Sequence, residues 1–333
     1  TTRTAGPAVT TASIAQLLAS ATTRDPLATG DGKSDARLER IVVEGQTLVV
    51  KHVDLRADWL ARASGERRCR HMLLWRSGVL DELPSCLDHA TVGCAEDTAR
   101  GTATVLLRDV SPWLVPPGPL SQAQHRRFLD HMAAMHARFW GHPERAGLLP
   151  MSRRYLVLSP QTAAAERARG GEHPVPARQI PQGWRRLPVA APRSAALAAE
   201  LVADPTPLLA ALARTPSTLL HGDWKVANLG TRPDGRTVLL DWSLAGVGPP
   251  CADLAWYLAV NAAALPEPRE DAIEAYRRSL ERHGVDTGKW WQAQLGLCLI
   301  GAFLLLGWDK TIGDPAEIGW WDDRVADAAR LLA

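Results

Sequence analysis

Two short apolar runs that enclose a polar segment constrain this chain more than any other feature. The runs, residues 217–220 and 237–240, predict short buried strands. Between them Asp223 and Asn228 stand five positions apart, and Asp241 follows the second run directly. The pattern therefore places three oxygen-bearing side chains at strand and loop ends.

The order of these three side chains suits phosphoryl transfer from ATP. That reaction needs an acid that orients the attacking hydroxyl and accepts its proton, and oxygen ligands that hold Mg²⁺ against the phosphates. We assign the first role to Asp223 and the second to Asn228 and Asp241. The alternative is ordinary turn chemistry, in which each Asp or Asn caps a loop. The joint order, with a strand on each side, favours phosphoryl transfer.

The same segment carries a family resemblance. The run HGDWKVAN at 221–228, followed by Leu240, Asp241 and Trp242, resembles the HGD-x-x-x-x-N and (I/L)DW motifs of the aminoglycoside phosphotransferase and choline kinase-like enzymes. Residues 246–255 are similar to that family's G-x-G-D-P-x-x-D-L-A segment, with Pro249 in place of its first acid. The resemblance implies an α+β, two-lobed protein-kinase-like fold, with a small antiparallel sheet in the N-terminal lobe and a larger, mostly helical C-terminal lobe.

The resemblance also implies roles for three further residues. His221 and Asp253 would support the catalytic loop, Asp253 by hydrogen bonding to the loop backbone from near the start of a helix. Lys225, two residues after Asp223, would stabilise charge on the γ-phosphate. The alternatives are an acid that only begins a helix at Asp253 and a surface lysine at Lys225.

A glycine-rich turn precedes a predicted hairpin, after a predicted helix at residues 13–21. Residues 38–43 and 47–53 predict the two strands, with the turn between them at residues 44–45. The glycine-rich turn would let backbone N–H groups approach phosphate oxygens closely. The nucleotide-binding residues expected there are Gly30, Gly32, Lys33 and Ser34. A glycine turn without a ligand is the alternative.

Lys51 lies inside the second apolar strand of this hairpin. A strand lysine usually extends to solvent, but the family resemblance implies that it contacts the α- and β-phosphates. The family normally anchors this lysine with a glutamate on the next helix. We predict that helix at residues 64–76, with Ser64 as its N-cap and Glu66 in its first turn. Glu66 is either the anchor or a solvated acid beside its basic neighbours.

The connection between the two lobes is expected after a predicted strand at residues 102–107. By resemblance, backbone groups of Arg108, Asp109 and Val110 would hold the adenine, and an ordinary exit from the strand is the alternative. The proline-rich run that follows supports a boundary. We therefore predict a nucleotide-binding lobe at 1–107, a hinge at 108–119 and a helical lobe at 120–333.

The C-terminal lobe should contain several helices. A helix opening at Ser121 has apolar residues at helical spacing and Gln124 at the capping-box position. Further helices are expected at 207–214, at 271–283 and at 290–308. Prolines and glycines in residues 148–215 predict breaks in any helix there, and the segment is either a substrate lid or a surface loop. Trp308 and Asp309 are substrate candidates, since an aromatic face stacks on a sugar and acids bind a polycation; a solvated helix face is the alternative.

Composition limits the remaining classes. The chain has 333 residues and a formal net charge of +2, so nothing indicates a nucleic-acid partner. Five cysteines without paired spacing indicate reduced thiols, and we expect a cytoplasmic protein. The most apolar segment, residues 293–308, is short for a membrane span and is expected to be a buried helix.

The sequence thus predicts an ATP- and Mg²⁺-dependent kinase that phosphorylates a hydroxyl of a small molecule. The acceptor classes considered are an aminoglycoside or another antibiotic, an amino alcohol such as choline, and a sugar. A nucleotide-binding pseudokinase that regulates a partner is the alternative. A protein serine/threonine kinase is disfavoured because no Asp-Phe-Gly with a downstream Ala-Pro-Glu follows.

Overall fold

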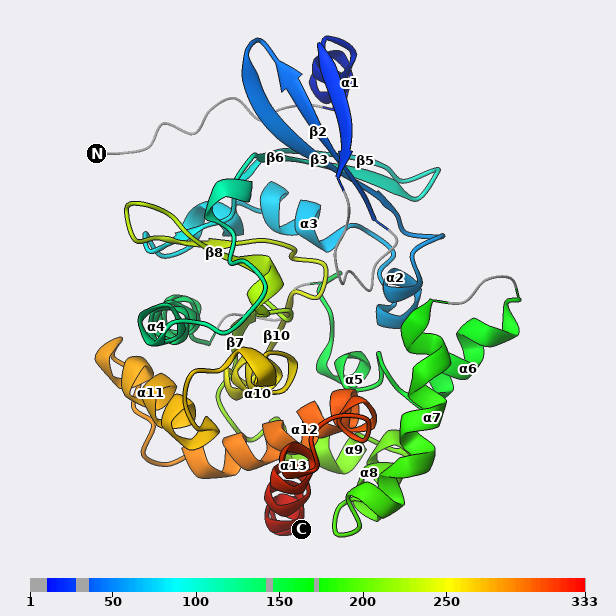
Figure 1. The fold of residues 1–333 in the computed structure, drawn as a ribbon, viewed down its shortest axis with the longest axis vertical. Coiled ribbons are helices and arrows are strands. Elements are labelled where there is room, and N and C mark those ends of the chain that lie inside the picture. The colour runs from blue at the N-terminus through cyan, green and yellow to red at the C-terminus, as the bar shows by residue number, and fades with distance from the viewer. Residues whose placement is uncertain (1–10, 28–35, 142–145, 171–173, 333) are drawn as a thin grey trace.

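The computed structural model describes residues 11–27, 36–141, 146–170 and 174–332. Its N-terminal part is an antiparallel sheet and its C-terminal part is mostly helical, which confirms the predicted α+β architecture (Figure 1). The expected glycine turn, with Gly30, Gly32, Lys33 and Ser34, lies outside the described residues. The division at residues 108–119 stays a prediction.

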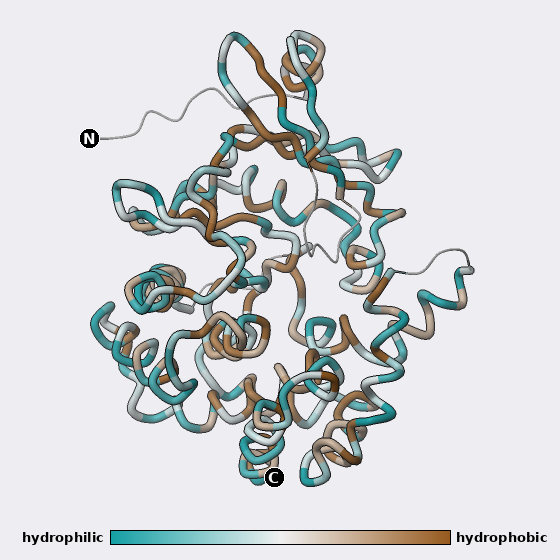
Figure 2. The backbone as a smooth tube through the Cα atoms, viewed as in Figure 1, coloured by the Kyte–Doolittle hydropathy of each residue, from teal (hydrophilic) through white to brown (hydrophobic). Residues whose placement is uncertain are grey.

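The N-terminal sheet has five strands in the order β1-β2-β3-β6-β5. The strands are β1 (Thr23–Leu27), β2 (Arg37–Val43), β3 (Gln46–Asp54), β5 (Thr91–Asp97) and β6 (Thr102–Arg108), and helix α1 (Thr11–Ala19) precedes them. Glu44 and Gly45 have φ of 49° and 77° between β2 and β3, the positive values that a two-residue hairpin turn requires. The predicted hairpin is confirmed, and Figure 2 shows the hydrophobic residues along its strands.

The predicted helix at 64–76 is wrong, because two shorter helices occupy this region. They are α2 (Trp59–Ser64) and α3 (Arg70–Arg76). Asp58 caps α2, and Gly65 ends it with a φ of 66°, the left-handed conformation that closes many helices. Ser64 is therefore the last residue of a helix, and Glu66 lies in the link between α2 and α3.

The polar segment between the two apolar runs is framed by short strands, as predicted. Strand β7 (Thr218–Leu220) pairs with β10 (Gly246–Gly248), and β9 (Thr237–Leu239) pairs with β8 (Leu229–Thr231). Strand β4 (Leu87–Asp88) joins β9 in parallel. A strand that precedes β5 and β6 in the chain therefore belongs to the sheet beside the catalytic loop.

The C-terminal part contains the helices α4 (Gln122–Arg138), α10 (Cys251–Val260), α11 (Arg269–Arg282), α12 (Trp291–Lys310) and α13 (Pro315–Ala328). Helix α12 packs against α10 and α13, and α11 packs against α4. Ser121 caps α4 by accepting a hydrogen bond from the Gln124 N–H. Helix α12 has the length and composition of a membrane span, but 83% of its apolar window is buried inside the protein. The expectation of a buried helix is confirmed.

The segment at 148–215 is mostly helical. The helix predicted at 207–214 is confirmed, whereas the expectation that glycines and prolines break any helix in the rest of the segment is wrong. It contains α5 (Met151–Arg154), α6 (Pro160–Ala168), α7 (Val175–Ala190), α8 (Ala195–Ala203) and α9 (Thr206–Leu212). Helix α7 continues through Pro181 and Pro188. Each internal proline costs a helix about 3 kcal/mol, and burial of one apolar side of α7 offsets that cost. At Gly183 a Cβ atom would lie 2.2 Å from the Trp308 carbonyl oxygen of α12, so the two helices pack closely.

Candidate active site

The Asp223 side chain is held by three donors from two elements. Its Oδ2 accepts hydrogen bonds from Asn228 Nδ2 at 2.9 Å and from Lys225 Nζ at 2.8 Å. Its Oδ1 accepts one from Trp256 Nε1 of α10 at 3.1 Å. Asp223 is 5% exposed. The three contacts therefore fix the orientation of a nearly buried carboxylate.

Helix α10 braces the backbone on which Asp223 sits. The Asp253 carboxylate accepts hydrogen bonds from the His221 N–H at 2.8 Å and the Gly222 N–H at 3.0 Å. Burial alone would raise the pKa of Asp253, but the hydrogen bond from His136 and the charge of Arg154 hold that pKa below its usual range. Asp253 therefore stays ionised and fixes the loop with charge-assisted hydrogen bonds.

The His221 ring bridges two segments of the site through hydrogen bonds at both of its nitrogens. Its Nε2 donates to the Leu240 carbonyl at 3.0 Å, and its Nδ1 accepts from the Asp223 N–H at 3.2 Å. Burial lowers the pKa of His221, which keeps the ring neutral and suits one donor and one acceptor nitrogen. The ring thus ties the end of β7 to the residue before Asp241.

Gly222 is a position where any side chain would strain this loop. Its φ is 84°, and a Cβ atom there would lie 1.9 Å from the Leu244 carbonyl oxygen. We expect Gly222→Ala to lower the free energy of unfolding by about 3 kcal/mol, from left-handed strain and overpacking. Gly235→Ala is the matched control, because Gly235 has a φ of 85° with nothing within 4 Å. Denaturant unfolding of both variants measures the difference, and equal losses would contradict the packing argument.

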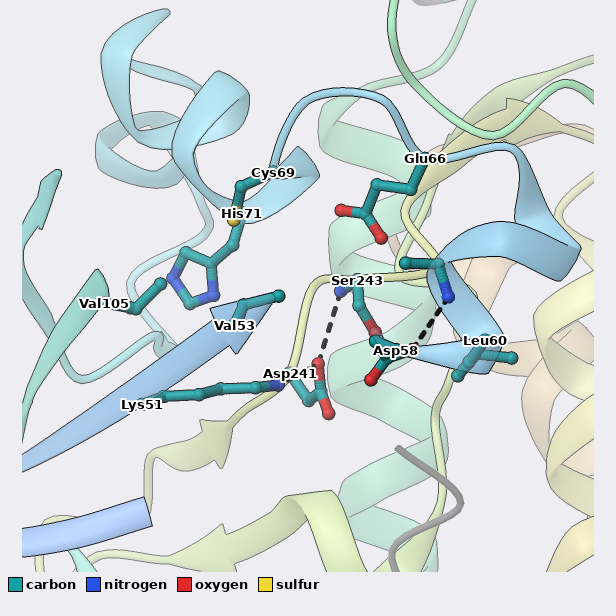
Figure 3. Close-up of a pocket in the computed structure, with 11 residues that line it drawn as sticks. Lys51, Val53, Asp58, Leu60, Glu66, Cys69, His71, Val105, Asp241 and Ser243 are labelled. Atoms are coloured by element: carbon teal, nitrogen blue, oxygen red, sulfur yellow. Dashed lines mark hydrogen bonds and ion pairs between the residues drawn. The ribbon is translucent and has the colours of Figure 1, made fainter. Parts of the chain in front are cut away.

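Asp241 and Lys51 form an ion pair across the site. Lys51 Nζ of β3 lies 2.8 Å from Asp241 Oδ1, and Figure 3 shows the lysine extending along the strand toward this carboxylate. Asp241 adopts a φ of 64°, an uncommon conformation for a residue other than glycine. Burial alone would raise the pKa of Asp241, but Lys51 and Lys225 hold it well below its usual range. The acid after β9 is therefore ionised and aimed at the N-terminal sheet.

Glu66 is placed differently from the expected anchor. It lines the same small cavity as Lys51 (Figure 3), but its carboxylate accepts from the Arg70 N–H at 2.7 Å and lies 3.5 Å from the Arg70 guanidinium. Lys51 instead pairs with Asp241. Neither alternative for Glu66 is met, because no Lys51–Glu66 ion pair forms and Glu66 is buried beside Arg70 and not solvated.

Arg70 connects the N-terminal helices to the segment after Asp241. Its buried guanidinium donates to the Ser64 hydroxyl at 2.9 Å, to the Ser243 carbonyl at 2.8 Å and to the Gly147 carbonyl at 3.3 Å. The sequence pattern indicated only that basic residues lie near Glu66. The Gly147 and Ser243 carbonyls are 77 and 173 positions from Arg70, so no local pattern signals these two contacts.

Trp256 and Arg154 are two further site residues that the sequence analysis missed. Arg154 Nη2 donates to the Gly222 carbonyl at 3.1 Å, and its guanidinium lies 6.0 Å from the ring of Trp256. Trp256 follows Asp253 by three positions on α10, so both face the catalytic loop. The three-residue spacing from Asp253 could have identified Trp256 from the sequence. No sequence pattern indicates that Arg154 contacts the loop.

The hinge residues use their side chains within the protein. Asp109 pairs with Arg40 at 2.8 Å, Arg108 pairs with Asp88, and Val110 is buried. Their backbone contact with adenine stays a prediction.

Trp308 is placed away from any substrate surface, contrary to expectation. It is 1% exposed, and its Nε1 donates to the Leu305 carbonyl at 2.8 Å within α12. The ring therefore offers no face to a sugar. The Asp309 side chain is 43% exposed and lies 3.9 Å from Lys310 Nζ.

His71 behind Lys51 makes stability depend on pH. Its Nε2 contacts Thr91 Oγ1 at 2.8 Å, and burial lowers its pKa to about 3. The unfolded chain binds a proton near the ordinary pKa of about 6.5, so stability is present above that value and is lost as pH falls. We expect the free energy of unfolding to drop by about 2 kcal/mol from this group between pH 7 and pH 5. Denaturant unfolding at both pH values should show a smaller drop for His71→Gln, and an unchanged drop would contradict this account.

The donor set around Asp223 fits a magnesium ion. The amide nitrogen of Asn228 is engaged with Asp223, so its Oδ1 would be the atom that binds a metal, and Asp241 would supply an ionised carboxylate. Mg²⁺ prefers one or two such oxygens together with phosphate oxygens and water. Asn228 and Asp241 are the residues that would hold it.

The fold and this site define a phosphotransferase. A family model described as the phosphotransferase enzyme family matches residues 28–286, well over half of the chain. The chain belongs to this family, and it is an ATP-dependent phosphotransferase that acts on a small molecule. No curated protein sequence matches the chain.

Solved structures of the same fold have low sequence identity to the chain. LicA in complex with AMP is 14% identical with a TM-score of 0.50, over 97% of this chain and 96% of that chain. Choline kinase LicA from Streptococcus pneumoniae is 14% identical with a TM-score of 0.47, over 95% and 94%. A thermostable mutant of aminoglycoside phosphotransferase APH(4)-Ia is 14% identical with a TM-score of 0.49, over 95% and 97%. At this identity the first match shows the fold.

Proposed function

We propose that this enzyme transfers the γ-phosphoryl group of ATP to a hydroxyl of a small molecule, with Asp223 as the base. The observation that carries the proposal is the Asp223 carboxylate held by Asn228, Lys225 and Trp256. A carboxylate fixed in this way orients the hydroxyl and accepts its proton as the oxygen attacks phosphorus. The protein's contribution is chiefly this positioning, as expected for phosphoryl transfer.

Two lysines supply positive charge on either side of the phosphates. Lys51 Nζ reaches the site from β3, and we assign it to the α- and β-phosphates. Lys225 Nζ lies 2.8 Å from Asp223 and is assigned to the γ-phosphate, where charge builds up in the transition state. The ion pair of Lys225 within the loop supports this role over that of a surface lysine.

Magnesium is the cofactor that Asn228 and Asp241 would hold. When bound, Mg²⁺ neutralises charge on the nucleotide phosphates. His221 and Asp253 keep the loop in place through their buried hydrogen bonds. The five free cysteines suit the predicted cytoplasmic location.

The test is a coupled ADP-release screen over amino sugars, amino alcohols, sugars, nucleosides and hydroxylated carboxylates and phosphates, with the Asp223→Asn variant as the blank. We expect ADP release that requires both Mg²⁺ and an added hydroxyl acceptor and that is lost in the variant. Nucleotide binding without turnover across the panel would contradict the proposal and favour the pseudokinase alternative.

A further inference from the structure

A groove separate from the cavity behind Lys51 lies between helix α2 and helices α5, α6 and α8. Its volume is about 490 Å³, within the range of roughly 300–1,000 Å³ that small-molecule sites occupy. The aliphatic side chains of Leu156 and Val202 line part of it. Figure 1 shows α2 near α6, and both helices contribute residues to the lining of the groove.

The charged residues of this groove are mostly basic. Arg62 is already satisfied, because it pairs with Glu166 and its Nη1 donates to the carbonyls of Arg56 and Ala57 at 2.6 and 2.5 Å. Arg153 uses only its Nε, which donates to the Ala63 carbonyl at 3.1 Å. Among the described residues no partner is present for the terminal nitrogens of Arg153 or for the guanidinium of Arg169. The groove therefore has two guanidinium groups available to an anion.

The groove adjoins the catalytic loop through α5. Arg153 lines the groove, and the next residue, Arg154, donates to the carbonyl of Gly222, which precedes Asp223. A ligand held by Arg153 is thus separated from the loop by this short helix. The groove is placed to hold the part of the acceptor that does not react.

Several acids of the C-terminal helices are engaged within the protein. Glu317 lies 3.0 Å from Lys310, and Asp322 accepts hydrogen bonds from the Ser194 N–H at 2.8 Å and the Arg193 N–H at 3.2 Å. Glu270 lies 2.6 Å from Arg324. At these three acids a polycationic acceptor would have to compete with internal hydrogen-bond donors or cations.

We propose that the phosphate acceptor has an apolar body and an anionic group, and that Arg153 and Arg169 bind that group in the groove. The inference rests on the proposed function and names the acceptor class for it: a hydroxylated carboxylate or phosphate. In the reaction the acceptor hydroxyl oxygen bonds to the γ-phosphorus as the bond to ADP breaks. The hydroxyl proton passes to the Asp223 carboxylate.

Binding of two fluorescent probes tests the groove itself. Anilinonaphthalene sulfonate is an apolar anion, and N-phenylnaphthylamine has the same aromatic skeleton without the charge. Arg153→Ala and Arg169→Ala should each weaken binding of the sulfonate about tenfold and leave binding of the neutral probe unchanged. Arg186→Ala is the matched control, an exposed arginine of α7 outside the groove. Equal effects on both probes, or no effect on the sulfonate, would overturn the inference.

Turnover of matched acceptors separates this inference from the proposed function. Hydroxylated carboxylates should be phosphorylated with a kcat/KM about a hundredfold above that of their neutral methyl esters, and the Arg153→Ala/Arg169→Ala double variant should abolish this preference. Phosphorylation of a polycation at a rate that the double variant leaves unchanged would overturn the inference alone. Absence of turnover with every acceptor would overturn the proposed function and the acceptor class with it.

Discussion

Asp223→Asn should lower kcat about a thousandfold while the KM for ATP changes little. The amide keeps the shape of the side chain and can still contact Asn228, but it cannot accept the proton of the attacking hydroxyl. The donors Lys225 Nζ and Trp256 Nε1 lose their charged partner, whereas Lys51, which is assigned to the α- and β-phosphates, pairs with Asp241 and keeps its partner. Steady-state kinetics with ATP and the best acceptor of the panel measures the change.

The control for this experiment is Asp323→Asn. Asp323 is an exposed acid of α13 that pairs with Arg193, so its loss should leave kcat unchanged. Thermal unfolding of both variants checks that each is folded. A kcat for Asp223→Asn within a few fold of the parent enzyme would remove Asp223 from the role of base.

Lys51→Met should lower kcat/KM for ATP about a hundredfold. Removal of one preorganised donor from a charged transition state costs a factor of about 10² to 10³, and Lys51 is the cation that β3 presents to the site, 2.8 Å from Asp241. The methionine retains the length of the side chain without its charge. Both ATP affinity and kcat should fall, because the lysine contacts the nucleotide in the ground state and in the transition state.

Lys289→Met serves as the matched control, since Lys289 is exposed on the C-terminal lobe. Isothermal titration with ATP separates the loss of binding from the loss of rate. Unchanged ATP affinity in Lys51→Met would show that the nucleotide phosphates lie elsewhere.

The loop at residues 221–228 was predictable because the residues that define it are close together in the chain. Asp223 and Asn228 belong to one turn and are hydrogen-bonded, and the Leu240 N–H, beside Asp241, donates to the Asn228 carbonyl. Spacing and the family resemblance together indicated this proximity, and the catalytic roles of the three residues stay a prediction. The hairpin with Lys51 was predictable for the same reason. Two short apolar runs and a Glu-Gly turn between them predict both strands.

The partners of Lys51 and Glu66 were not predictable from the sequence. Whether Glu66 faces Lys51 depends on where α2 ends. The left-handed Gly65 ends α2, so Glu66, the next residue, lies outside the helix. Arg70 then takes Glu66 as its partner and reaches Ser243, a residue 173 positions away. The contact between Arg70 and Ser243 depends on how distant parts of the chain pack together. The periodicity of the sequence does not predict such a contact.

The helical content of residues 148–215 was missed for an energetic reason. Local propensity penalises Pro181 and Pro188, whereas the burial of α7 against α12 is a tertiary effect. The same packing buries Trp308, which composition alone suggested as a substrate residue. Local rules fail here because a neighbouring helix covers the segment.

The central claim is that Asp223 directs the γ-phosphoryl group of ATP onto an acceptor hydroxyl. Mass spectrometry of the reaction mixture tests it most directly, with ATP, Mg²⁺ and the acceptor present in parallel reactions of the parent enzyme and Asp223→Asn. We predict that the acceptor gains one phosphoryl group in step with ADP formation, and that both products are absent with the variant. ADP formed with an unmodified acceptor, or a phosphorylated acceptor formed equally by Asp223→Asn, would contradict the claim.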